Sequence, residues 1–66
     1  MSLSLNNIRT HSKYRLTNFG EIYEFEVVEI LMFDDFKLKD IHTMEIYLFS
    51  DLIVEGKGKD FSVWKI

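Results

Sequence analysis

Three aromatic residues and one carboxylate are the strongest candidates for a binding site in this 66-residue chain. Aromatic rings bind an alkylated ammonium ion when three or four of them converge around it, usually beside a carboxylate. The candidates would meet at one end of a small β-structure if its loops converge, and they are Phe19, Tyr23, Tyr47 and Asp51. The simpler interpretation is that the rings serve only in the core and in cross-strand packing.

Five basic residues form a second candidate site, a patch for the phosphates of RNA or DNA. They are Arg9, Lys13, Arg15, Lys57 and Lys59. The patch requires the N-terminal arm to approach a glycine-containing loop at residues 55–59. A net charge of −3 argues against a general nucleic-acid binder, so this remains the alternative hypothesis. Salt-dependent binding of single-stranded nucleic acid would distinguish it from protein binding.

No metal, cofactor or catalytic site is predicted. His11 and His42 are far apart in the sequence, and zinc needs three or four ligands. The acidic residues within positions 21–29 are interpreted as a solvated strand face, because calcium requires a ligand-rich loop. Asp40 is expected to accept hydrogen bonds from the amides of His42 and Thr43 in a turn. No acid–base pair can be placed beside a nucleophile, which predicts a protein that is not an enzyme.

The elements that would position these residues are predicted to be strands. Five segments favour extended structure by their apolar patterning and composition: residues 13–19, 22–33, 36–41, 45–49 and 60–66. The second of them becomes apolar on both faces, which predicts a strand that bends midway and is then covered on both sides. Asn18 and Gly20 are expected to supply positive φ angles in a hairpin loop. Residues 50–53 are predicted to form one helical turn capped by Ser50.

This order predicts an all-β fold, a small five-stranded barrel with one short helical turn before the last strand. The arrangement resembles SH3-like barrel domains, and the helical turn at residues 50–53 carries most of that resemblance. The stretches Tyr-Arg-Leu-Thr-Asn-Phe-Gly-Glu and Gly-Lys-Gly-Lys-Asp-Phe also resemble a family of short bacterial proteins to which no activity is assigned. The resemblance covers residues 13–66. It implies the fold but no particular function, since SH3-like barrels bind peptides, methylated residues or nucleic acids, or serve in assembly.

The chain is expected to comprise an N-terminal arm at residues 1–12 and the barrel domain at residues 13–66. It contains neither cysteine nor a long apolar run, and no secretion signal opens it. These features predict a cytoplasmic protein that does not enter a membrane.

The inward positions of the alternation predict a core of seven residues: Phe25, Val27, Leu31, Leu38, Ile46, Leu48 and Val63. Eight further large apolar residues then lie outside it: Tyr14, Phe19, Ile30, Phe33, Tyr47, Phe49, Trp64 and Ile66. Monomers rarely expose large apolar patches, so a covering surface is expected. It would be the arm, through Leu5 and Ile8, or a second copy of the chain, which is the preferred hypothesis. The sequence therefore predicts an interaction module whose partner is another protein or itself.

Overall fold

The structure is a computed structural model that describes residues 5–32 and 34–66. Its strands are β1 (Lys13–Asn18), β2 (Glu21–Ile30), β3 (Phe36–Asp40), β4 (Ile46–Leu48) and β5 (Ser62–Lys65). Two short helical segments accompany them, a 3-10 turn η1 (Leu5–Asn7) and the α-helix α1 (Phe49–Leu52). The predicted all-β class, with one short helix before the last strand, is confirmed.

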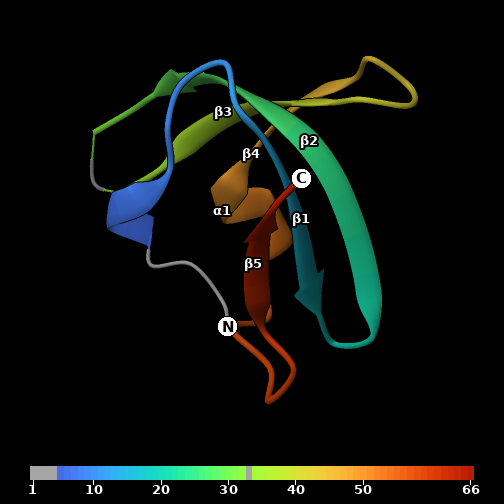
Figure 1. The fold of residues 1–66 in the computed structure, drawn as a ribbon. Helices are drawn as coiled ribbons and strands as arrows, with labels where there is room; N and C mark the ends of the chain where they lie inside the picture. The colour runs from blue at the N-terminus through green and yellow to red at the C-terminus, as the bar shows by residue number, and fades with distance from the viewer. Residues whose placement is uncertain (1–4, 33) are drawn as a thin grey trace.

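The strands form one antiparallel sheet in the order β4-β3-β2-β1-β5 (Figure 1). The first four follow one another as the predicted meander, and β5 returns to pair with β1, where Leu16 lies opposite Val63. No hydrogen-bonded pairing joins the edge strands β4 and β5 among the described residues, so the prediction of a closed barrel was wrong. The reason is that β4 has only three residues and leads directly into α1.

The long strand β2 is shared by both halves of the sheet and curves between them (Figure 1). Its pairing with β3 shifts register between Val27 and Glu29, which leaves Val28 as an extra residue. Such a bulge bends a strand and increases its twist, as the sequence predicted for this segment. Ile30 and Met32 are exposed, so the described residues of the chain do not themselves cover this second face, and cover by a second copy stays a prediction. The expectation for Phe33 lies outside the described residues.

The core lies on the inner face of this curved sheet. It comprises Ile8, Tyr14, Leu16, Phe25, Val27, Phe36, Leu38, Phe49 and Val63. Four of the seven predicted core residues are among them. Leu31 and Leu48 are half-buried, and the assignment of Ile46 to the core was wrong because this residue is 52% exposed. Ile46 lies opposite Lys39, whereas Tyr47 lies opposite the buried Leu38, so β4 turns its other face inward.

Two residues predicted to lie outside the core are instead buried, namely Tyr14 and Phe49. The hydroxyl of Tyr14 accepts a hydrogen bond from the Arg9 amide at 2.9 Å, so its polar group is satisfied inside the protein. Phe49 is the first residue of α1, and its ring meets that of Phe36 edge to face at 5.5 Å. The cap predicted at Ser50 was also wrong, because α1 begins one residue earlier.

The N-terminal segment contributes to the core through Ile8, which is only 7% exposed. The amide of His11 then donates to the carbonyl oxygen of Val27 at 2.7 Å, which holds this segment against β2. The side chain of Leu5 lies outside what the structure describes. In the described part of the chain, neither helical segment is long or apolar enough to cross a membrane.

Candidate functional site

The turn between β1 and β2 presents Phe19 to solvent in an uncommon backbone conformation. Phe19 and Gly20 both have positive φ angles, 50° and 76°, where Asn18 and Gly20 were expected to provide them. A positive φ is unfavourable for a bulky residue. The Asp60 carboxylate accepts hydrogen bonds from the Phe19 amide at 2.8 Å and the Gly20 amide at 2.7 Å. Hydrogen bonds from Gly20 and Phe19 keep the pKa of Asp60 below its ordinary value, so the carboxylate stays charged and holds the turn.

Asn18 fixes the loop after α1 against this turn. Its side chain is buried, and its amide nitrogen donates to the carbonyl oxygens of Leu52 and Gly56 at 3.2 and 3.0 Å. Its side-chain oxygen accepts a hydrogen bond from the Gly58 amide at 2.7 Å. A Cβ atom on Gly58 would lie 2.9 Å from the Phe19 ring, so glycine allows the ring to lie directly against this loop.

Two aspartates position α1 on the other side of the site. Asp35 accepts hydrogen bonds from the Ser50 amide at 3.0 Å and from the Ser50 hydroxyl at 2.9 Å. Asp51 accepts one from the Leu48 amide at 3.0 Å. Partial burial raises the pKa of Asp35, but the hydrogen bonds from Phe36 and Ser50 outweigh it, and the net pKa lies below the ordinary value. The charged form of Asp35 therefore anchors the start of the helix to β3.

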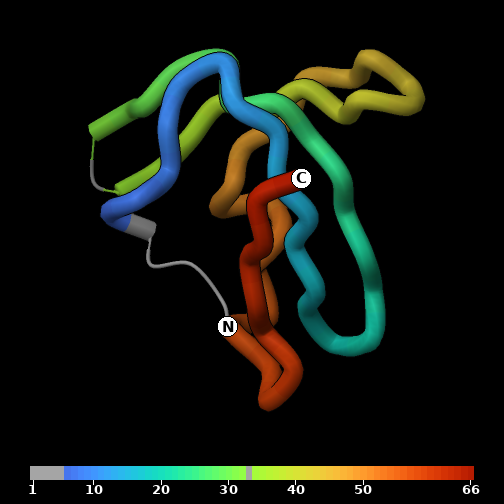
Figure 2. Tube along the Cα trace, in the orientation of Figure 1, coloured from blue at the N-terminus to red at the C-terminus, as the bar shows by residue number. Residues whose placement is uncertain are grey.

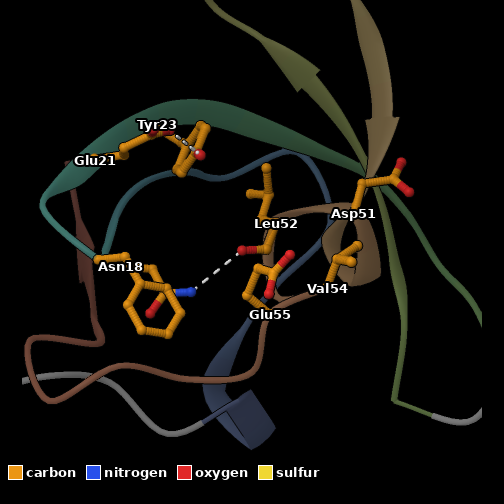
Figure 3. A pocket seen from close by; sticks show the side chains of 8 residues that line it. Asn18, Glu21, Tyr23, Asp51, Leu52, Val54 and Glu55 are labelled. Carbon is orange, nitrogen blue, oxygen red and sulfur yellow. Dashed lines mark hydrogen bonds between the residues drawn. The ribbon is translucent and has the colours of Figure 1, made fainter.

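Two adjoining hollows lie between the start of β2 and α1, and we call them together the groove. The first, of about 540 Å³, is lined by Asn18, Phe19, Glu21, Tyr23, Asp51, Leu52, Val54 and Glu55 (Figure 3). The second, of about 310 Å³, is lined by Tyr23, Asp40, Glu45, Ile46, Tyr47, Asp51 and Leu52. Three residues border both hollows, so the two lie side by side. In Figure 3, Glu21 and Tyr23 stand on β2, across the first hollow from Leu52 and Glu55.

All four residues of the aromatic candidate site line this groove. Tyr23 and Asp51 border both hollows, Phe19 borders only the first and Tyr47 only the second. The rings are therefore spread along the groove instead of surrounding one point. An elongated ligand fits this arrangement better than the single alkylated ammonium ion considered from the sequence.

The groove is acidic. Its carboxylates belong to Glu21, Asp40, Glu45, Asp51 and Glu55, and no lysine, arginine or histidine of the described residues lines either hollow. None of the five forms an ion pair with another described residue. Their combined negative charge exceeds the net charge of the whole chain, which is −3. The groove therefore attracts cations.

Two tyrosine hydroxyl groups in the groove differ in their environments. The hydroxyl of Tyr23 donates to Glu21 at 2.6 Å, and this hydrogen bond is the main cause of its raised pKa. The hydroxyl of Tyr47 is buried and has no hydrogen-bond partner among the described residues. Burial, followed by the charges of Asp40 and other neighbours, raises the pKa of Tyr47 to about 12. Both hydroxyls are therefore neutral at physiological pH.

The structure does not gather the five residues of the predicted basic patch. Because β1 and β5 are antiparallel, Lys13 lies at the opposite end of this pair from the loop that carries Lys57 and Lys59. Figure 2 shows residues 9–13 at the upper end of the molecule and residues 55–60 at the lower end. Arg15 is 2.8 Å from Glu24, so its charge is compensated. The Lys57 ammonium lies 5.0 Å from the centre of the Phe61 ring.

The acidic residues of β2 that face outward are compensated in the same way. Glu24 accepts a hydrogen bond from Arg15 at 2.8 Å and lies 2.7 Å from His42 Nε2. Contacts with His42 and Arg15 lower the pKa of Glu24. Among the described residues, no three acidic or histidine side chains gather as metal ligands would. Both histidines are exposed, and Asp40 accepts the predicted hydrogen bonds from the amides of His42 and Thr43, at 2.7 and 3.0 Å.

Sequence reasoning missed several groove residues. Asn18 did carry a signal, because it continues the inward-facing series of Tyr14 and Leu16 at a position where a polar residue needs partners. Glu45 and Glu55 carried none, since they lie in loops whose approach to β2 depends on the complete fold.

Comparison of the chain with protein-family models, with curated proteins and with solved structures gives no match. The resemblance to a bacterial family therefore stays a prediction.

Proposed function

We propose that the chain is an SH3-like, non-enzymatic interaction domain whose groove binds a segment of another protein. The SH3-like assignment is supported by the strand order, by the bent β2 and by the helical turn between β4 and β5. A bacterial origin and a cytoplasmic location belong to the same proposal, and the absence of cysteine from the chain supports a reducing compartment.

The observation that carries this proposal is the conformation and exposure of Phe19. Phe19 borders the groove and is 57% exposed, although its backbone occupies a region that disfavours bulky residues. Asn18, Gly58 and Asp60 together maintain this arrangement. Strain held in place by several neighbours is typical of a binding site, because an asparagine or glycine would satisfy the turn alone at lower cost.

Two alternatives have weaker support. A nucleic-acid partner would need the five basic residues to act together, but Lys13 lies at the opposite end of the β1–β5 pair from the loop that carries Lys57 and Lys59, and the groove itself is acidic. A second copy of the chain would need a continuous apolar face. On the outer face of the sheet, Trp64 lies opposite Arg15, and Ile46 lies opposite Lys39, so charged residues interrupt the apolar ones.

The proposal can be tested by capture and mapping. The purified chain is immobilised and exposed to nuclease-treated extract of its native cells, and retained proteins are identified by mass spectrometry. The decisive variant is Phe19→Asn, because asparagine tolerates the positive φ and the variant should fold. Ile22→Thr is the matched control, since Ile22 is exposed but does not line the groove.

We expect the wild-type chain and Ile22→Thr to retain the same protein and Phe19→Asn to lose it. Titration of that protein into the ¹⁵N-labelled chain should shift amide resonances around residues 19–23 and 47–55. Retention by all three chains, or shifts confined to the outer face of the sheet, would overturn the proposal. Retention found only in a parallel capture from untreated extract would instead support the nucleic-acid alternative.

A further inference from the structure

We infer that the groove binds an extended peptide segment carrying two basic side chains, one in each hollow. This inference rests on the proposed function and adds the chemistry of the ligand. It follows from how charge and apolar surface are divided between the two hollows.

Each hollow presents its own carboxylates. Glu21 and Glu55 border only the first hollow, Asp40 and Glu45 border only the second, and Asp51 borders both. Each hollow therefore has three carboxylates around it. Lysine and arginine form charge-assisted hydrogen bonds with carboxylates, and these are stronger than hydrogen bonds between neutral groups. One cation in each hollow would compensate charges that form no ion pair with another described residue.

The same acids contrast with those on the outer face of the sheet. There, Glu24 contacts Arg15 and His42, and Glu26 lies between Lys13 and Lys39 in the strand register. The chain thus compensates the outer acids with its own bases and leaves the groove acids without them. This division of charge favours a positively charged ligand from outside the domain.

Apolar surface beside the carboxylates suits the long stems of lysine and arginine. The Phe19 ring and Val54 border the first hollow, while Ile46 and Tyr47 border the second. Basic side chains lay their methylene groups on such surfaces while the charged ends contact acids. Aromatic faces also attract cations. A free polyamine shares the charge. We assign the ligand to a peptide because the proposed function is the binding of a protein segment, and spermidine is compared with the peptide in the test.

The test uses a random peptide display library selected on the immobilised chain, followed by fluorescence anisotropy with a labelled selected peptide. We expect selected sequences to contain two lysine or arginine residues. Replacing either base by glutamine should weaken binding about tenfold, and replacing both should abolish it. Raising the salt concentration from about 50 mM to about 500 mM should also weaken binding.

Variants of the chain locate the two cations. The side chains of Glu45 and Glu55 make no hydrogen bond or ion pair with the described residues, so Glu45→Gln and Glu55→Gln should fold normally. Each should weaken the two-base peptide several-fold and should lower the benefit of only one of its bases. Glu29→Gln is the matched control, because Glu29 lies on β2 opposite Lys37 and away from the groove.

Three results would overturn the inference: selection of neutral or acidic peptides, equal effects of Glu29→Gln and the groove variants, or equally tight binding of spermidine. If the captured protein binds at the groove while no basic peptide does, the proposed function stands and the ligand chemistry is wrong. If Phe19→Asn changes the binding of neither the captured protein nor the basic peptide, the groove is not the binding site.

Discussion

Asn18 is the residue on which the groove depends most directly. Its buried side chain satisfies three backbone groups, on Leu52, Gly56 and Gly58, through partly buried hydrogen bonds. A buried backbone group without a partner costs about 1–3 kcal/mol, and small domains have only about 3–5 kcal/mol of stability. The environment of one side chain therefore affects both the fold and the site.

Replacing Asn18 by alanine should reduce the free energy of unfolding by about 3 kcal/mol, because three groups lose their partner. Asn18→Asp should also be destabilised, since its carboxylate can accept from Gly58 but cannot donate to the two carbonyl oxygens. Urea unfolding, monitored by the fluorescence of Trp64, measures the stability of both variants. A loss well below 1 kcal/mol in Asn18→Ala would show that water replaces the side chain.

Removing the Tyr47 hydroxyl should not destabilise the fold, in contrast to replacing Asn18. This buried hydroxyl has no partner among the described residues, so Tyr47→Phe removes a desolvated polar group without breaking a hydrogen bond. We expect unchanged stability or a gain of up to about 1 kcal/mol. Tyr14→Phe is the matched comparison and should lose about 1 kcal/mol, because the Tyr14 hydroxyl accepts from the Arg9 amide. Equal losses in the two variants would contradict this account.

At the scale of the elements, strand position was predictable from the sequence and strand phase was predictable only in part. Alternation over β1, β2 and β3 extends over five or more residues, which is enough to show which residues share a face, although Tyr14 of β1 was placed outside the core. β4 has three residues, and a pattern that short does not separate Ile46 and Leu48 from Tyr47. Its phase is set by pairing with β3, which places Tyr47 opposite Leu38.

The candidate site was predictable to a similar extent. The sequence identified four site residues, because aromatic rings and a carboxylate near turns can converge at one end of a small β-structure: Phe19, Tyr23, Tyr47 and Asp51. Their distribution over two hollows was not predictable, since it depends on where α1 lies relative to β2. The acidic character of the groove could not be predicted for the same reason. Its carboxylates come from β2, β3, the turn between β3 and β4, α1 and the loop after α1.

The stability lost when a side chain is truncated should increase with the burial of that side chain. Leu16→Ala in β1 should cost about 2–5 kcal/mol, because Leu16 is completely buried and the change leaves a cavity. Leu48→Ala in β4 should cost less, since Leu48 is only half-buried. Thermal melts monitored by circular dichroism show which of the two variants loses more stability. A greater loss in Leu48→Ala would show that β4 contributes more to the core than its exposure indicates.

At the scale of the whole molecule, stability should depend on pH through carboxylates that accept hydrogen bonds in the folded state. The pKa values of Glu24, Asp35, Asp40 and Asp60 are lowered in the folded state. Each group therefore stabilises the fold above its unfolded pKa of about 4, and this stabilisation is lost as the pH falls through the lower folded value.

Urea midpoints should accordingly fall between about pH 4 and pH 2. Asp40→Asn should show a shallower decline, because asparagine still accepts from the amides of His42 and Thr43 but does not titrate. At high pH, the raised pKa of Tyr47, about 12, makes stability fall as the pH rises above 10. Tyr47→Phe should reduce that alkaline decline. Identical acid profiles for Asp40→Asn and the wild-type chain would contradict the role of Asp40.

Self-association stays a prediction, and the structure gives reason to expect it to be weak. Ile8 fills part of the core, and charged neighbours interrupt the exposed apolar residues of the sheet. Analytical sedimentation over a hundredfold concentration range should give a mass close to 7.9 kDa at the lower concentrations. Trp64→Arg is a useful comparison. A stable mass of twice this value throughout would show that a second copy covers the sheet.

The contacts of Asp60 also have a consequence for the order in which the chain folds. This carboxylate holds the amides of Phe19 and Gly20 across 41 and 40 positions of sequence. The turn between β1 and β2 is local, but its support comes late in synthesis. Contacts between distant residues slow folding, because the intervening chain must be ordered first. A nascent chain that ends before residue 60 therefore has the hairpin sequence without the groove, and a ligand of the groove would distinguish finished domains from unfinished ones.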